Sequence, residues 1–131
     1  GRRAAELAGV PVVAQGTMNR DHIIRAMEMA EAMGVERPDR FDDQEGPPAD
    51  FGKPEAELTH QVDGSAVIAR KRASMLAHES QIGPDHFMAA MPDEAFAYVF
   101  GPEFFIVDQP LDDAPALFGE LFTPLDHGVP A

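Results

Sequence analysis

The sequence predicts an α/β protein in which helices cover a layered sheet, and two observations carry this prediction. Residues 10–33 contain a strand-like run, a short turn and an amphipathic helix, which is the order of elements typical of an α/β layer. Short strand-like runs then recur at 58–62 and 103–107, with helical segments between them. A hydrophobic fraction of 44% over 131 residues suits one small domain or part of a larger one.

The first half of the chain supplies one strand and one long helix. The β-branched residues around Val12 predict a buried strand over 10–17. Asn19 or Asp21 can cap a helix over residues 20–33, because its apolar side chains recur at helical spacing. This helix is suited to lying on a sheet.

The second half alternates short strands with helices. Capping residues and first-turn prolines predict where the helices begin, and glycine predicts where the third one ends. We expect strands over 58–62 and 103–107, and helices over 66–80, 85–90 and 92–101.

Two Pro-rich, acidic stretches limit the predicted domain. Residues 36–57 predict a long surface loop, and such loops are either functional or mobile solvated insertions. Residues 108–131 form an acidic, Pro-rich tail with one brief apolar turn around Leu117. We therefore expect one domain over 1–107, interrupted by the loop and followed by the tail. The first nine residues resemble a helix end without its N-cap, so we expect the chain to be the C-terminal part of a longer one.

The charge distribution excludes several classes of protein. The net charge is -13, and residues 83–131 carry nine acidic groups and no Lys or Arg. Such a surface repels phosphate backbones, so we expect no nucleic-acid partner. No apolar run reaches 18 residues, which predicts no membrane span. Cysteine is absent, which fits a cytoplasmic location.

Residues 70–81 are the most informative segment, because a Lys and a His fall on a mainly apolar helical face. On a helical wheel, His78 shares this face with Val67, Lys71, Ser74, Met75 and Ile82. Polar groups on such a face must find partners or line a cavity. Spacing alone leaves two interpretations of His78 open. It favours a structural histidine that hydrogen-bonds a loop and fixes it over a residue of a functional cleft.

A metal site within this chain has little support from spacing. The five histidines contain no pair with the spacing of a helical two-His site. His60 and Asp63, three residues apart, come nearest to a chelating pair, but no local cluster reaches the ligand number that zinc needs.

The order of residues 71–82 resembles a signature near the C-terminus of the LmbE-like, or PIG-L-type, de-N-acetylases. That signature runs Lys-Arg-x-Ala/Ser-hydrophobic-x-Ala-His-x-Ser-Gln, and here it matches Lys71, Arg72, His78, Ser80 and Gln81. The resemblance continues into the Pro-Asp-x-Phe string at 84–87 and the Phe-Gly-x-Glu-Phe-Phe string at 100–105. It covers roughly residues 1–107 and omits the tail.

The resemblance implies a Rossmann-like layered sheet with covering helices and a zinc-dependent amidohydrolase that removes the acetyl group of an amino sugar or related amide conjugate. In that family one zinc ion activates water, and its ligands come from His-Pro-Asp-Asp and His-Pro-Asp-His motifs. Neither string occurs in this sequence. The resemblance therefore assigns no zinc ligand and no catalytic base here. It leaves Lys71, His78, Ser80 and Gln81 as candidates for the substrate cleft or for a structural role.

We therefore expect the C-terminal part of a deacetylase, inactive by itself, whose substrate is a small N-acetylated amino sugar or amide. The alternative is a non-catalytic binding or assembly module. In that case the His78-x-Ser-Gln segment would be a structural lock at a helix end, and the apolar face would pair with another subunit, which could be a second copy of the chain.

Overall fold

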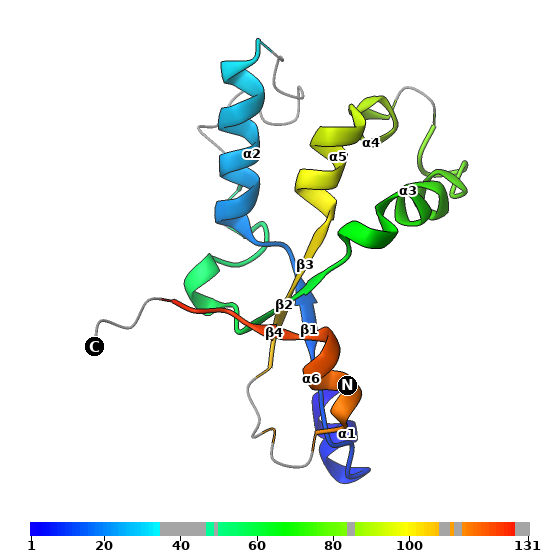
Figure 1. The fold of residues 1–131 in the computed structure, drawn as a ribbon. Coiled ribbons are helices and arrows are strands. Elements are labelled where there is room, and N and C mark those ends of the chain that lie inside the picture. Colours follow the sequence, from blue (N-terminus) through cyan, green and yellow to red (C-terminus); the bar gives the residue numbers. More distant parts are fainter. Residues whose placement is uncertain (35–46, 49, 84–85, 108–110, 112–113, 128–131) are drawn as a thin grey trace.

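The computed structural model describes residues 1–34, 47–48, 50–83, 86–107, 111 and 114–127 (Figure 1). The elements follow in the order α1 (Arg2–Leu7), β1 (Gln15–Thr17), α2 (Arg20–Ala32), the 3₁₀ turn η2 (Glu55–Glu57), β2 (His60–Asp63), the 3₁₀ turn η3 (Ser65–Val67), α3 (Ile68–Leu76), α4 (Phe87–Ala90), α5 (Asp93–Phe100), β3 (Pro102–Ile106), α6 (Ala116–Leu121) and β4 (Thr123–Pro124).

The predicted mixture of helices and strands is confirmed, and the strands form one open sheet. Its order is β1-β3-β2-β4, and all three pairings are antiparallel. Figure 1 shows α2, α5 and α3 extending from one end of this sheet, with α1 and α6 at the other end. The Rossmann-like layering stays a prediction. Among the described residues, no helix is both long and apolar enough to cross a membrane.

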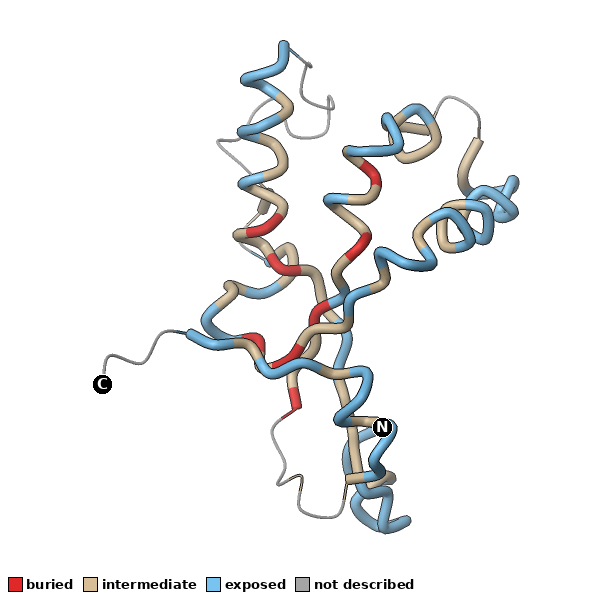
Figure 2. The backbone as a smooth tube through the Cα atoms, in the orientation of Figure 1, coloured by how far each residue is buried: buried red, intermediate tan, exposed pale blue. Residues whose placement is uncertain are grey.

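The buried residues lie along the sheet and at the helix ends that meet it, as the red segments in Figure 2 show. The buried apolar side chains of the described residues are Leu58, Phe96, Phe104 and Val107. Leu58 and Phe96 are at most 1% exposed, yet large apolar residues elsewhere, such as Met33 and Leu7, are more than 70% exposed. The described chain thus buries a small core and leaves much apolar surface open.

Helix α2 begins and ends almost as predicted. The Asn19 side chain accepts a hydrogen bond from the backbone N–H of His22 at 3.1 Å, which makes Asn19 rather than Asp21 the N-cap. At the other end Gly34 adopts a φ of 77°, the left-handed conformation that glycine accepts at low cost. Local capping chemistry was therefore sufficient to place this helix.

Two predicted elements are shorter in the structure. The strand expected over 10–17 is a strand only over Gln15–Thr17, because Gln15 pairs with Ile106 at the very end of β3. The helix expected over 66–80 begins with η3 and ends at Leu76. Residues 76–81 are all exposed, so no tertiary packing supports the helix beyond that point.

The regions expected as loop and tail hold some regular structure. Within 36–57, η2 forms and Lys53 makes a parallel bridge to Asn19. Within 108–131, the apolar turn is helix α6, and β4 pairs with β2. Much of both stretches lies outside the described residues, as do Pro84 and Asp85 before α4. His86 caps α4 by accepting the N–H of Met88 at 3.3 Å.

Candidate functional site

A cleft of about 420 Å³ lies between the start of α2, the end of α5 and the sheet, and we call it the central cleft. Its walls are mainly apolar and aromatic, with Phe100, Phe104 and Phe105 among them. The polar lining residues with ionisable side chains are His22, Lys71 and Glu103. A concave, largely apolar site of this size with a few polar groups is typical of small-molecule binding sites.

Lys71 is the signature residue that reaches the central cleft. Its Nζ donates hydrogen bonds to the backbone oxygen of Phe100 and to Oε1 of Glu103, each at 2.6 Å. The first bond satisfies a carbonyl in the last turn of α5, where a cation also interacts favourably with the helix dipole. The second neutralises the lysine with an acid from β3. Lys71 therefore joins α3 to the end of α5 and the start of β3 at the edge of the cleft.

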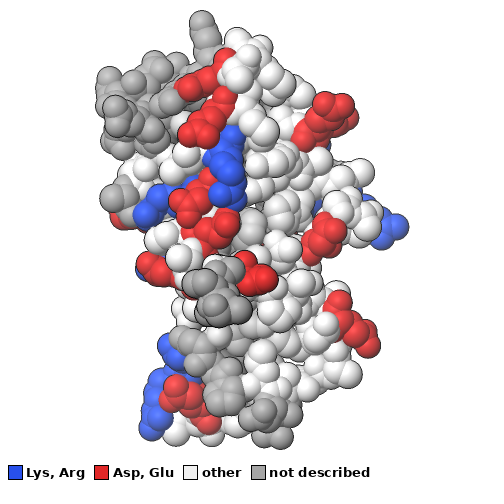
Figure 3. Space-filling model, turned by 60° about the vertical axis from the view of Figure 1, so that its left-hand side comes forward, with Lys and Arg blue, Asp and Glu red and all other residues white. Residues whose placement is uncertain are grey.

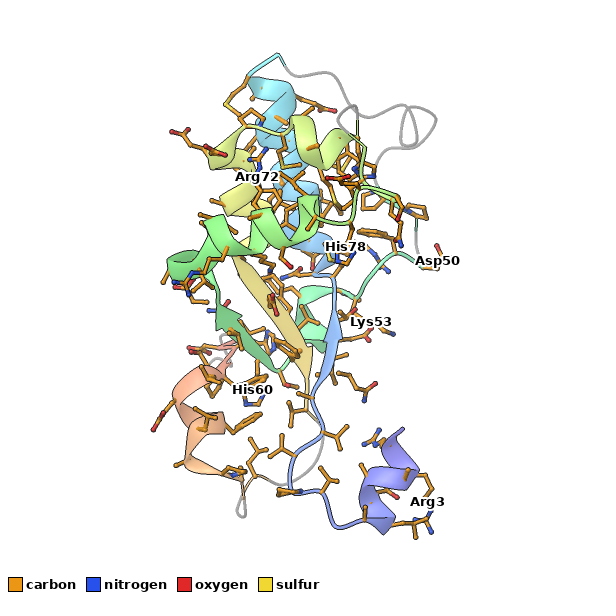
Figure 4. The ribbon with its side chains drawn as sticks, turned by 90° about the vertical axis from the view of Figure 1, so that its right-hand side faces the viewer. Arg3, Asp50, Lys53, His60, Arg72 and His78 are labelled. Carbon is orange, nitrogen blue, oxygen red and sulfur yellow. The ribbon has the colours of Figure 1, made fainter. Side chains whose placement is uncertain are left out.

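Arg72, the next residue, faces α4 and α5 rather than the cleft (Figure 4). Its guanidinium donates to the backbone oxygens of Ala89 and Met91 at 3.0 and 2.5 Å, and to Asp93 at 2.8 Å. It also lies 4.9 Å from the ring centre of Phe96, a cation–π distance. Lys71 therefore binds the end of α5 and β3, whereas Arg72 binds α4 and the start of α5.

The other three candidates lie beyond the end of α3 at Leu76, and Figure 4 labels the first of them, His78. His78, Ser80 and Gln81 are exposed and do not line the central cleft. The backbone turns here, because the oxygen of His78 accepts the N–H groups of Gln81 and Ile82, both at 2.9 Å. The side chains of His78, Ser80 and Gln81 make no hydrogen bond within the described part of the chain. The shared helical face expected for Lys71 and His78 was wrong, because the helix ends between them.

The start of α2 is held in place by the segment around Lys53. The backbone N–H of Lys53 donates to Met18 at 2.8 Å, and its oxygen accepts the N–H of Arg20 at 2.9 Å. Glu55 then accepts hydrogen bonds from Asn19 at 2.9 Å and from Arg25 at 2.6 Å. These contacts fix the first turn of α2, which forms one wall of the cleft.

The charge of Glu55 contributes to this arrangement, so its removal should change the pH dependence of stability. The hydrogen bond from Arg25, followed by that from Asn19, lowers the pKa of the Glu55 carboxyl below its ordinary value. A depressed carboxyl pKa stabilises the fold above the unfolded pKa of about 4.3 and loses this contribution as the pH falls through the folded pKa.

We expect Glu55→Gln to flatten the acid limb of the stability curve below about pH 4.3 and to leave its slope near neutrality unchanged. Urea unfolding at a series of pH values measures this directly. Glu79→Gln is the matched control, because Glu79 is exposed. An unchanged acid limb in the Glu55 variant would show that these hydrogen bonds do not contribute to stability.

His60 and Asp63 do not form the chelating pair that their spacing allowed. His60 (Figure 4) is buried, its Nδ1 lies 2.8 Å from the Thr59 hydroxyl, and its ring forms a T-shaped pair with that of Phe118. Burial lowers the pKa of His60. Asp63 is exposed and accepts the N–H of Ser65 at 2.9 Å. No group of three or more potential metal ligands occurs in the described residues, so they do not fit a zinc site.

His22 is a cleft residue that the sequence analysis overlooked. It is 9% exposed and lines the central cleft from the first turn of α2. A signal for it was present, because Ala26 and Ala30 follow at one and two helical turns. A polar ring at the end of such an apolar stripe is unusual and needs a partner or a cavity.

The structure therefore defines a mixed α/β chain with an antiparallel sheet and a mainly apolar cleft at the meeting point of α2, α5 and β3. Comparisons with protein-family models, with curated proteins and with solved structures found no match.

Proposed function

We propose that this chain is the C-terminal part of a zinc-dependent de-N-acetylase that acts on an N-acetylated amino sugar or a related amide conjugate. One observation carries the proposal: Lys71, in the segment that resembles the family's signature, lines a cleft large enough for a small ligand. Two further features of the structure support the proposal. The walls of the cleft are well anchored, and His78, Ser80 and Gln81 are exposed, so they can meet another segment.

The zinc motifs are absent from the sequence, and the described residues do not fit a zinc site. The proposal therefore places the metal and the catalytic base in polypeptide outside these residues, within a Rossmann-like layered domain. The antiparallel sheet described above would then be one part of a larger mixed sheet, since antiparallel edge strands are common on otherwise parallel sheets. This chain would supply one wall of the substrate cleft.

The reading frame upstream of Gly1 provides the first test of the proposal. We expect it to encode His-Pro-Asp-Asp and His-Pro-Asp-His motifs. The longer polypeptide should release acetate from N-acetylglucosamine conjugates in a zinc-dependent way, whereas the 131-residue chain should release none. A start codon near Gly1, or acetate release by the 131-residue chain, would rule out the proposal.

In the longer polypeptide, His78→Ala should lower kcat/KM at least tenfold with an unchanged melting temperature. The reason is that His78 is exposed and makes no hydrogen bond within the described residues, so its loss should not affect this part of the fold. Glu79→Gln, at the adjacent exposed position, is the control for both measurements. A lower melting temperature with normal turnover would instead assign His78 a structural role.

A non-catalytic assembly module is the second candidate, and exposed apolar side chains favour it. Leu117 and Leu121 of α6 are 60% and 49% exposed, and they line an apolar groove with Val10. In this case the chain would associate with itself or with another subunit through that face. Light scattering across a concentration series would show the association, and the upstream reading frame would lack the zinc motifs.

A further inference from the structure

His22 has a fixed position and orientation in the central cleft. Its backbone is held by the Asn19 cap, and its ring stacks on Tyr98 with centroids 4.6 Å apart and planes 19° apart. The ring of Phe104 is tilted against that of His22, with the two ring centroids 5.5 Å apart. Two aromatic neighbours and a helix cap therefore leave the imidazole little freedom to rotate.

The hydrogen bond at Nε2 determines where the ring proton lies. Nε2 is 2.8 Å from the backbone oxygen of Tyr98. A carbonyl oxygen only accepts, so Nε2 must carry the proton and donate it. In a neutral imidazole the other nitrogen, Nδ1, is then an unprotonated acceptor.

Nδ1 has no hydrogen-bond partner within the described part of the chain. In that same part, no buried side-chain nitrogen or oxygen is left without a partner. Nδ1 must therefore be reachable from solvent, and the cavity that His22 lines is the central cleft. A side chain that is nine-tenths buried and lines a cleft of about 420 Å³ thus has one ring nitrogen with no partner among the described residues.

The two other ionisable side chains of the cleft balance in charge, and the Thr17 hydroxyl is a further polar group that lines it. Lys71 is paired with Glu103 at 2.6 Å. The Asn19 side chain is used by Glu55 and by the backbone of His22. With Lys71 and Glu103 paired, the ring nitrogen of His22 that lacks a partner favours an uncharged ligand with hydrogen-bond donors over an anion.

We propose that the central cleft binds a neutral small molecule through a hydroxyl or amide N–H that donates to Nδ1 of His22, with the aromatic walls covering its apolar side. All the groups involved belong to this chain. The inference therefore does not depend on the proposed hydrolysis and needs no zinc.

Nuclear magnetic resonance of the ¹⁵N-labelled chain tests both parts of this proposal. Long-range ¹H–¹⁵N spectra at about pH 8 should show His22 protonated at Nε2 and not at Nδ1. N-acetylglucosamine, as a neutral probe with hydroxyl and amide donors, should shift Nδ1 of His22 and the amides of Phe104 and Phe105 in a saturable way. Its 6-phosphate should bind no more tightly.

Two variants separate the acceptor from the fold. His22→Gln can still donate to Tyr98 and still offers an acceptor oxygen, so its affinity for the probe should stay within threefold. His22→Phe retains the stacking but has no nitrogen, and it should weaken binding at least fivefold. If His22→Phe fails to fold, the NMR measurements on the unaltered chain still test the proposal. A proton on Nδ1, no saturable shift at the cleft, or tighter binding of the phosphate would each overturn the proposal.

Discussion

Replacing Arg72 with alanine should lower the free energy of unfolding by about 2–3 kcal/mol, because one guanidinium satisfies two backbone carbonyls and covers an aromatic ring. The carbonyl of Ala89 belongs to the last turn of α4, and that of Met91 to the connection between α4 and α5. The Arg72 side chain is only 17% exposed, so water cannot fully replace it after truncation. Urea unfolding followed by circular dichroism measures the loss.

Three further variants show which contact matters. Arg70→Ala removes an exposed arginine two residues earlier and should cost less than about 0.5 kcal/mol. Asp93→Ala removes only an acid that is 97% exposed, so stability should hardly change. Arg72→Lys keeps the charge but loses the planar fork, and it should fall between the alanine variant and the unaltered chain. Equal losses for Arg70→Ala and Arg72→Ala would show that the charge of the segment, and not these contacts, is important.

The two residues Lys71 and Arg72 show how far the sequence could be interpreted. The pattern indicated that Lys71 and His78 need partners or a cavity, which holds for Lys71 alone, and it made no such prediction for Arg72. It could not name those partners, because Phe100, Glu103 and Asp93 lie more than 20 residues further along the chain. Local rules fix which residues need a partner, whereas the partners come from tertiary packing.

The helices and strands likewise divide into those that local sequence signals predict and those that depend on tertiary packing. Helix α2 was predicted because capping and helical spacing are local properties. The end of α3 was missed because residues 76–81 have helical spacing but are all exposed, so burial does not extend the helix. The pairing of β4 with β2 was missed because a two-residue strand containing Pro124 carries almost no signal of its own. The helical spacing of His22, Ala26 and Ala30 was visible in the sequence, but the partner that orients the His22 ring, Tyr98, lies far along the chain.

The central cleft depends on a close backbone approach behind it, and Gly52→Ala should disrupt that approach. Gly52 has a φ of 63°, and a Cβ there would overlap the backbone oxygen of Met18. That oxygen is the acceptor for Lys53, whose own oxygen holds the first turn of α2. We expect a loss on the order of 3 kcal/mol, of which about 1–2 kcal/mol comes from the left-handed conformation and the rest from the overlap.

Gly9→Ala is a matched control, because Gly9 has the same φ of 63° and nothing within 4 Å of the added Cβ. It should cost only the conformational part, about 1–2 kcal/mol. The difference between the two variants therefore measures the contact between Gly52 and Met18. The Gly52 variant should also lose protection from hydrogen exchange at the amides of Arg20 and Lys53, while the Gly9 variant should not. Equal losses of stability with normal exchange protection would mean that this approach does not position α2 or the wall of the cleft that carries His22.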